Sequence, residues 1–321
     1  MKTLLISPDT FGYYKKIQST LEQKGHVVNW INLVKYTGIV GRIAQRLFPR
    51  FLQRTLDNYF LDNINKSTSY DFIIIIKGEG ISKKVIEVLK RSYPHSKKIF
   101  YAWDSLSNIN FDINLYSFFD SVKSFDHADI SNNKSIKHLP LFYDKNLILN
   151  SPAKSNVGAF FVGTLHSNRF NEINAISEKV EKNLKLNSFL YFYYPNKILF
   201  LLAKLIFRNL KGIKTESISF VKLPFDKLME QMNSCNVVID ICHPGQSGLT
   251  MRTIECVGAK KKVITNNRSI LEYDFYKSEN IYLLGETRCF DAFLKEQYSE
   301  LSDDVYTKYE LSNWVGSLIH D

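Results

Sequence analysis

Short apolar runs alternate with amphipathic segments along the chain, and glycine, proline or polar residues separate them. Residues 3–7, 27–33 and 70–76 are apolar and rich in β-branched side chains, as in the buried strands of a parallel sheet. The segments 13–24 and 82–92 have apolar positions at helical spacing. This alternation predicts that the first half is a doubly wound α/β domain.

The second half repeats the pattern. A strand is predicted at 157–162, a loop with Gly163 follows, and a helix extends to about residue 183. Near the end, the run 236–241 precedes a glycine-containing loop and a helix. We therefore expect two Rossmann-like, doubly wound parallel-sheet domains that face a cleft. The expected boundaries are 1–145 for the first domain, 146–300 for the second, and 301–321 for a C-terminal helix that packs back on the first.

Composition supports folded domains and suggests an anionic partner. The chain has 321 residues, of which 45% are hydrophobic, and its formal net charge is +10. The positive charge is spread over both halves and no zinc-finger, homeodomain or RRM signature is present. Charge alone leaves a nucleic-acid binder as one alternative, although we expect no nucleic-acid partner. The N-terminal segment lacks the apolar run of a signal peptide, which predicts a cytoplasmic protein.

Two basic and apolar segments suggest contact with a membrane surface. Residues 39–60 interleave arginines with apolar and aromatic residues, and residues 196–211 form an apolar helix with interspersed lysines. Such helices can lie on an anionic bilayer. Alternatively, each is an ordinary helix that packs on its sheet.

The loop 245–248 and the helix after it have the features of an anion site. A glycine loop that leads into a helix N-terminus provides backbone N–H groups and a positive dipole end. Arg252 and Glu255 lie three positions apart on that helix, so one can contact phosphate and the other ribose hydroxyls. A surface salt bridge on a crossover helix is the alternative. Gly258 is expected to end this helix.

Several motifs resemble those of bacterial glycosyltransferases of the GT-B fold, of the lipopolysaccharide and capsular polysaccharide type. The motifs that carry the resemblance are Phe161-Val162-Gly163-Thr164 with Arg169, Lys222, the segment from Gly245 to Glu255 with Gly258, and in the first half Trp103-Asp104-Ser105 and Ser124-Phe125-Asp126.

The resemblance implies a donor site in the second half. Glu255 would contact the donor ribose, and the residues after the glycine loop would hold the diphosphate. The implied donor-binding residues are Gly163, Thr164, Arg169, Lys222, His243, Ser247, Gly248, Leu249, Thr250, Arg252 and Glu255.

The resemblance also bears on the mechanism. Retaining members often carry two acidic residues eight positions apart, but Ser247 and Val263 flank Glu255 at that spacing, which favours an inverting reaction. An inverting transferase needs a base on the acceptor side. Asp104 is the first candidate, Asp9 the second and Asp126 the third. Each has a structural alternative as a turn or helix-cap residue.

The expected activity is therefore glycosyl transfer from a nucleotide-sugar, UDP-linked by our prediction, to a lipid-linked or polysaccharide acceptor in O-antigen or capsule biosynthesis. The expected partners are the donor, a lipid-linked glycan and the anionic inner-membrane surface, to which the protein would bind peripherally. We expect no cofactor and no metal. The alternatives are an enzyme similar to sugar-nucleotide epimerases and a non-catalytic nucleotide-sugar-binding protein.

Overall fold

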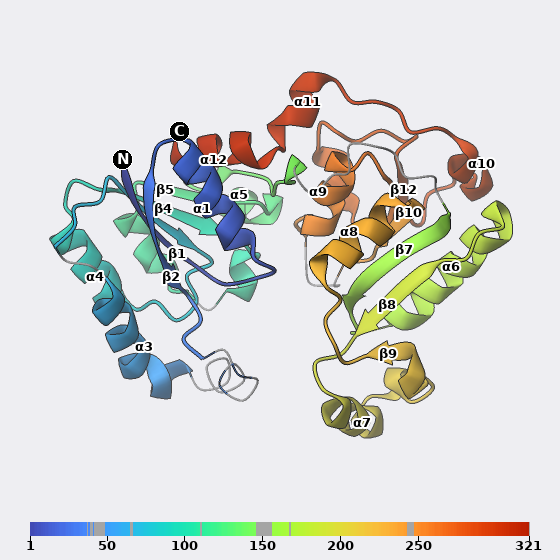
Figure 1. The fold of residues 1–321 in the computed structure, drawn as a ribbon, viewed down its shortest axis with the longest axis horizontal. Helices are drawn as coiled ribbons and strands as arrows, with labels where there is room; N and C mark the ends of the chain where they lie inside the picture. Colours follow the sequence, from blue (N-terminus) through green and yellow to red (C-terminus); the bar gives the residue numbers. More distant parts are fainter. Residues whose placement is uncertain are drawn as a thin grey trace. The chain divides into compact units, whose positions relative to one another are not determined.

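The chain folds into two compact units, each built on one parallel sheet. The computed structural model describes residues 1–36, 38, 41, 49–64, 67–109, 111–145, 156–166, 168–242 and 247–320. Unit 1 comprises Met1–Leu141 and Leu311–Asp321, and unit 2 comprises Phe142–Glu310. Each unit contains a six-stranded sheet (Figure 1). The predicted fold class of two Rossmann-like α/β domains is confirmed.

Unit 1 alternates strands and helices. Its strands are β1 (Lys2–Ser7), β2 (Val27–Asn32), β3 (Phe72–Ile76), β4 (Lys97–Ala102), β5 (Ser121–Ser124) and β6 (Lys137–His138). Its helices are α1 (Tyr13–Gln23), α3 (Pro49–Asn63), α4 (Lys83–Ser92), α5 (His127–Asn132) and α12 (Leu311–Ile319), with the 3-10 turns η1 (Leu106–Asn108) and η2 (Ile113–Phe118).

The sheet of unit 1 is covered on both faces. Successive side chains of a strand point to opposite faces, and β4 shows this directly. Phe100 belongs to the apolar cluster that includes Leu56 and Phe60 of α3, whereas Tyr101 packs edge-to-face on Trp314 of α12 with ring centroids 5.1 Å apart. The sheet is therefore doubly wound.

The C-terminal helix α12 is part of unit 1. The indole Nε1 of Trp314 donates to the carbonyl of Pro140 at 2.8 Å. Two lysines satisfy carbonyls at the end of the helix: Lys97 Nζ donates to Ile319 at 3.2 Å and Lys123 Nζ to His320 at 2.9 Å. Carbonyls at a helix C-terminus lack intrahelical partners, so these donors stabilise the end.

Unit 2 follows the same alternation. Its strands are β7 (Val157–Thr164), β8 (Phe189–Tyr193), β9 (Ile218–Ser219), β10 (Cys235–Asp240), β11 (Lys262–Thr265) and β12 (Ile281–Leu283). Its helices are α6 (Arg169–Leu184), α7 (Lys197–Ile206), α8 (Phe225–Asn233), α9 (Met251–Gly258), α10 (Phe290–Lys295) and α11 (Asp303–Lys308), with the 3-10 turns η4 (Arg208–Leu210), η5 (Thr215–Ser217) and η6 (Arg268–Glu272).

Two apolar clusters bury the two faces of this sheet. Phe161 of β7 belongs to the cluster formed with α6, α7 and α10, and its neighbour Phe160 to the cluster formed with α8 and α9. The strand order is β12-β11-β10-β7-β8-β9, whereas unit 1 has the order β2-β1-β3-β4-β5-β6. The units therefore share an architecture but differ in the strand pair between which the chain reverses direction across the sheet.

In the first of the two segments predicted to contact a membrane, residues 39, 40 and 42–48 lie outside the described residues. In α3, Leu56 and Phe60 are fully buried in the core cluster of unit 1, whereas Phe51 near the start of the helix is 86% exposed. Among the residues that the structure describes, no helix is long and apolar enough to cross a membrane.

Candidate functional site

Two of the motifs predicted to bind the donor lie at the carboxyl edge of the unit 2 sheet. The chain winds from β7 outward to β9, then crosses back to β10 on the other side of β7. Ligands of doubly wound sheets bind beyond the carboxyl ends of the strands at such a switch point. β7 ends in Gly163 and Thr164, and β10 ends in Asp240 just before the loop to α9. The fold thus brings together two motifs that are far apart in the sequence.

Arg169, the first residue of α6, joins the ends of these two strands. Its Nη1 donates to the carbonyl of Thr164 at 3.2 Å, and its Nε donates to the carbonyl of Ile241 at 3.0 Å. Burial lowers the pKa of this guanidinium, and the nearby Asp240 carboxylate opposes that shift. At Gly163 an added Cβ would lie 2.8 Å from the Phe161 ring and 3.1 Å from Arg169 Nη1. Arg169 therefore holds the ends of β7 and β10 together. Its contact with a donor stays a prediction.

The N-terminus of α9 is fixed to the end of β10 by Asp240. The hydroxyls of Thr250 and Thr253 both donate to Asp240 Oδ2 at 2.6 Å. Thr250 also caps the helix, because its Oγ1 accepts from the amide of Thr253 at 3.3 Å. The helix start, with its positive dipole end, is thereby held at the switch point.

Our sequence analysis did not identify Asp240 and Thr253 as part of this site. For Asp240, the available signal was a carboxylate at the last position of an apolar strand. The hydroxyl at position 253 gave no signal, because a threonine inside a helix is common.

Two asparagines after β11 hold the loop that precedes α9. Asn266 Oδ1 accepts from the amide of Cys242 at 2.9 Å. Asn267 Nδ2 donates to the carbonyls of Ser247 at 3.2 Å and Gly248 at 3.1 Å. These carbonyls are turned toward Asn267. Leu249 is buried in the unit, and His243 lies outside the described residues.

Arg252 and Glu255 form an ion pair inside the unit. Arg252 Nη1 lies 2.7 Å from Glu255 Oε2, and the side chains are only 18% and 7% exposed. The guanidinium also stacks over Phe160, 5.6 Å from the ring centroid, and contacts Met232 Sδ at 3.3 Å. The pair exists as the alternative interpretation expected, but it is buried and not on the surface. The ribose contact of Glu255 stays a prediction.

The other predicted donor residue, Lys222, lies in the segment that crosses from β9 to α8. Its side chain is exposed. The neighbouring carbonyl of Val221 accepts from the Tyr191 hydroxyl at 2.7 Å, which ties this segment to β8. The long, flexible side chain of Lys222 would have to extend to reach an anion. The contact of Lys222 with the donor diphosphate also stays a prediction.

Gly258 was expected to end helix α9 through the conformational freedom of glycine, but the structure gives another reason for a glycine at this position. α9 includes Gly258, and the left-handed residue that follows it is Lys260, with φ 51°. A Cβ at position 258 would lie 2.4 Å from Cγ of Tyr143. Glycine is therefore required there by close packing on the Tyr143 ring, and not by its backbone freedom.

The carboxyl edge of unit 1 presents the candidate bases. Asp104 follows β4, and its side chain is 39% exposed. Its Oδ2 lies 3.8 Å from Nζ of Lys77, which follows the adjacent strand β3 and also lies 3.4 Å from Glu79. Asp104 Oδ1 accepts from the Ser105 amide at 3.1 Å. Asp104 therefore combines a fixed position with access to solvent.

The third candidate, Asp126, is fully buried. It caps α5 by accepting from the amide of Ala128 at 3.0 Å, and it accepts a hydrogen bond from the Ser105 hydroxyl. Beside it, Asp129 accepts from Ser124 Oγ at 2.5 Å. This geometry favours the structural alternative for Asp126. Asp9, after β1, is exposed and stays the second candidate.

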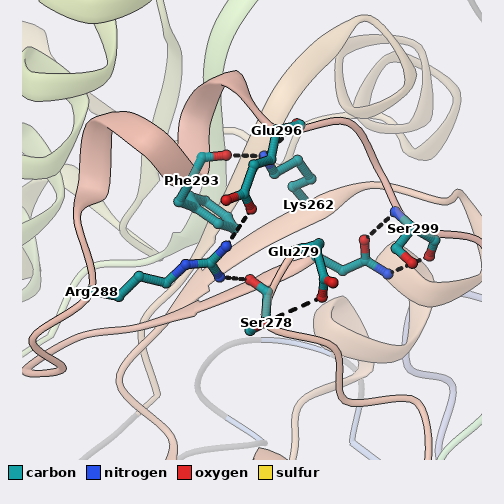
Figure 2. Close-up of polar contacts among 8 residues, drawn as sticks. Lys262, Ser278, Glu279, Arg288, Phe293, Glu296 and Ser299 are labelled. Atoms are coloured by element: carbon teal, nitrogen blue, oxygen red, sulfur yellow. Dashed lines mark hydrogen bonds and ion pairs between the residues drawn. The ribbon is translucent and has the colours of Figure 1, made fainter.

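A separate polar cluster in unit 2 lies at the amino end of β11 (Figure 2). Lys262 Nζ donates to the carbonyls of Phe293 and Glu296, the latter at 2.8 Å, and lies 4.1 Å from the Phe293 ring centroid. Burial lowers the pKa of Lys262 to about 8. Lys262 satisfies carbonyls at the end of α10, and Arg288 donates to the Ser278 carbonyl and pairs with Glu296, so we interpret the cluster as structural.

Within the described residues, no group of three or more His, Cys, Asp or Glu side chains is placed to hold a metal ion.

Comparison with known proteins identifies the fold. No family model matches the sequence, and no curated protein does. Among solved structures, the catalytic domain of starch synthase IV from Arabidopsis thaliana, bound to ADP and acarbose, aligns with a TM-score of 0.54 at 10% identity, over 99% of this chain and 95% of that one. At such identity the alignment establishes the fold alone.

Two further structures are similar at lower scores. Anabaena HepE in complex with UDP has a TM-score of 0.48 at 14% identity, over 99% of this chain and 94% of that one. WaaG, a glycosyltransferase involved in lipopolysaccharide biosynthesis, has a TM-score of 0.48 at 12% identity, over 100% of this chain and 94% of that one.

Proposed function

We propose that this protein is a glycosyltransferase that moves a sugar from a nucleotide-sugar donor to an acceptor hydroxyl. The observation that carries the proposal is the switch point of unit 2, where Arg169 joins β7 to β10 and Asp240 fixes the start of α9. Nucleotides bind at such points in doubly wound sheets. The sequence motifs and the fold shared with a starch synthase support the same class of enzyme.

The donor diphosphate would bind at the start of α9. Helix dipole and backbone amides there stabilise the negative charge that develops on the leaving diphosphate. Asn267 and Asp240 pre-order this segment from either side, so little rearrangement is needed during the reaction. Lys222 would add positive charge, and Glu255 would contact the ribose.

Asp104 would act as the base on the acceptor. In an inverting transfer the acceptor oxygen attacks the anomeric carbon, the bond from that carbon to the diphosphate oxygen breaks, and the hydroxyl proton passes to the carboxylate. Asp104 is preferred over Asp126, because a buried helix cap cannot reach a substrate hydroxyl without losing its own hydrogen bonds.

The finer assignment follows the sequence resemblance. We propose a UDP-linked donor, a lipid-linked or polysaccharide acceptor of O-antigen or capsule biosynthesis, and a cytoplasmic location at the inner membrane. We also propose that no metal or other cofactor takes part, so a chelator such as EDTA should leave turnover unchanged.

A thermal-shift screen against UDP, ADP, GDP, CDP and dTDP tests the donor site. A ligand at about 100 times its dissociation constant stabilises a protein by about 2.7 kcal/mol, which raises the melting temperature by a few degrees. Glu255→Gln keeps the side-chain volume and should remove most of the shift. Glu300→Gln is the matched control, since Glu300 pairs with Lys260 at 2.7 Å but is 65% exposed. Each variant is compared with its own ligand-free melting temperature.

The outcomes separate the alternatives. A shift with one nucleotide that Glu255→Gln abolishes and Glu300→Gln retains supports the donor site. If no nucleotide shifts the melting temperature and RNA does, the proposal is wrong and the charge-based alternative gains. If a nucleotide-sugar binds and is converted without any acceptor, an activity similar to that of sugar-nucleotide epimerases replaces glycosyl transfer.

A further inference from the structure

Helix α7 of unit 2 exposes most of its large apolar side chains and buries only a few. It lies beyond strand β9, at one end of the unit (Figure 1). Only Phe200 and Ala203 of its apolar residues are buried in the core cluster. Asn196 caps its start by accepting from the amide of Ile198 at 2.8 Å, and Lys204 Nζ donates to the carbonyl of Ile213 at 2.7 Å. The helix is thus firmly attached by a narrow inner face.

Its outer face consists of large apolar side chains. Ile198, Leu201, Leu202, Leu205 and Ile206 are 68%, 45%, 51%, 75% and 74% exposed. Their spacing of three, four, seven and eight positions places them on one side of the helix. Phe207 extends this surface, with 54% exposure. An ordinary surface helix presents polar residues there, and contiguous exposed apolar patches mark interaction surfaces.

The charged residues near α7 in the sequence favour an anionic lipid surface as its partner. Residues 195–215 contain no Asp or Glu, whereas the basic residues in this range are Lys197, Lys204, Arg208, Lys211 and Lys214. Glu216 is the first acidic residue after this range. An apolar face with a mainly basic surround matches the interface of an anionic bilayer. A second copy of this chain fits poorly, because a two-fold contact would place the same basic surround against itself.

We propose that α7 docks on an anionic lipid surface. The outer apolar residues enter the boundary between headgroups and acyl chains, and the basic residues contact lipid phosphates. The helix has 10 residues, and about 20 are needed to span a bilayer, so it lies along the surface. This inference rests on the membrane location proposed above and names the surface that would make the contact, but it does not depend on the proposed reaction.

Vesicle flotation with the full-length protein tests the proposal. The wild type should bind vesicles of phosphatidylcholine with phosphatidylglycerol and should bind pure phosphatidylcholine much more weakly. Leu205→Gln/Ile206→Gln should reduce binding on the order of tenfold or more, because two inserting side chains become polar. Lys211→Gln/Lys214→Gln should also weaken binding, and its residual binding should be less sensitive to salt.

A matched control replaces two exposed apolar residues elsewhere. Ile113→Gln/Leu271→Gln changes side chains that are 60% and 44% exposed and should bind vesicles like the wild type. Melting temperatures of all variants check that the fold is intact. Because the nucleotide screen needs no vesicles, failure of one proposal is distinguishable from failure of the other.

Three results would overturn the docking proposal. One is equal vesicle binding by the wild type and Leu205→Gln/Ile206→Gln. Another is equal binding of the wild type to charged and neutral vesicles. The third is a wild-type dimer in sedimentation velocity that the same double substitution converts to a monomer without any lipid binding, which would assign the face to a second copy.

Discussion

The side-chain carboxylates at the carboxyl edges of the two sheets differ in their exposure to solvent and in their hydrogen-bond partners. In unit 1, Asp9 and Asp104 reach solvent, whereas Asp126 is buried. In unit 2, the two carboxylates of the candidate site are engaged internally, Asp240 by threonine hydroxyls and Glu255 by Arg252. Similar topology therefore supports two kinds of edge, one that keeps a carboxylate accessible and one that uses carboxylates to fix a helix.

This difference suggests that the two edges have different roles in the reaction. An accessible carboxylate can accept a proton from an acceptor hydroxyl. In unit 2, Asp240 is held by two threonine hydroxyls and Glu255 by Arg252, so we expect these carboxylates to order the site and not to act as the base. Substitutions on the first edge should change turnover, and substitutions on the second should change stability and nucleotide binding.

The largest expected effect is on turnover at Asp104. Asp104→Asn should reduce the rate about 10²- to 10⁴-fold, because the general base is removed, while the nucleotide-induced thermal shift stays as in the wild type. Rates are measured with a labelled nucleotide-sugar and a membrane extract as the acceptor source. Glu79→Gln, which alters the other carboxylate beside Lys77, should keep the rate within a few-fold. A loss with Asp9→Asn and not with Asp104→Asn would move the base to Asp9.

The buried pair of unit 2 should dominate stability. Glu255→Met should lower the free energy of unfolding by about 3–5 kcal/mol, since it leaves the Arg252 charge buried without its partner, whereas Arg252→Met/Glu255→Met should be near neutral. Urea unfolding measures both. In unit 1, Lys77→Met should change stability by less than about 1 kcal/mol, because the Lys77–Asp104 pair is partly exposed. Equal losses from Glu255→Met and Lys77→Met would contradict the distinction between the two edges.

Removal of the cap of α9 should have a smaller effect. Thr250→Val removes the acceptor for the Thr253 amide and one donor to Asp240, so we expect a loss of about 1–2 kcal/mol in the free energy of unfolding. Nucleotide affinity should also fall, because the helix start is less ordered. The exposed Thr10→Val serves as control. Unchanged affinity in Thr250→Val would show that the order of the helix start does not matter for binding.

The smallest effect concerns pH and Asp129. Burial raises the pKa of the Asp129 carboxyl above 3.8, and hydrogen bonds from Ser124 and the Leu106 amide oppose the shift. The folded protein then holds this proton more tightly than the unfolded chain does. Its contribution to stability is present at low pH and is lost as the pH rises through the folded pKa.

The stability of the wild type relative to Asp129→Asn should therefore decrease as the pH rises from about 4 toward neutral. Urea unfolding at several pH values measures this difference, with the exposed Asp62→Asn as control. A difference that grows with pH would mean that the fold stabilises the ionised form of Asp129, which would contradict the prediction.

Much of the fold and part of the site could be predicted from the sequence. Apolar runs such as Phe72–Ile76 identified the strands, because burial on both faces requires a continuous apolar run. The loop before α9 was found from its glycines. The strand orders, the burial of Glu255 and the contact between Gly258 and Tyr143 were not predicted, since they depend on residues far away in the sequence.

The sequence by itself determined the alternation of strands and helices. It also determined that candidates such as Gly163 and Thr250 lie at the end of a strand or the start of a helix, because local hydrogen bonding and side-chain periodicity decide these positions. Only the tertiary structure decided that Arg169 joins residues at Thr164 and Ile241, that Asp240 engages two threonines, and that α7 turns its apolar face outward. The physical reason is that a side chain's partner and its exposure are set by the packing of distant elements, which no local pattern encodes.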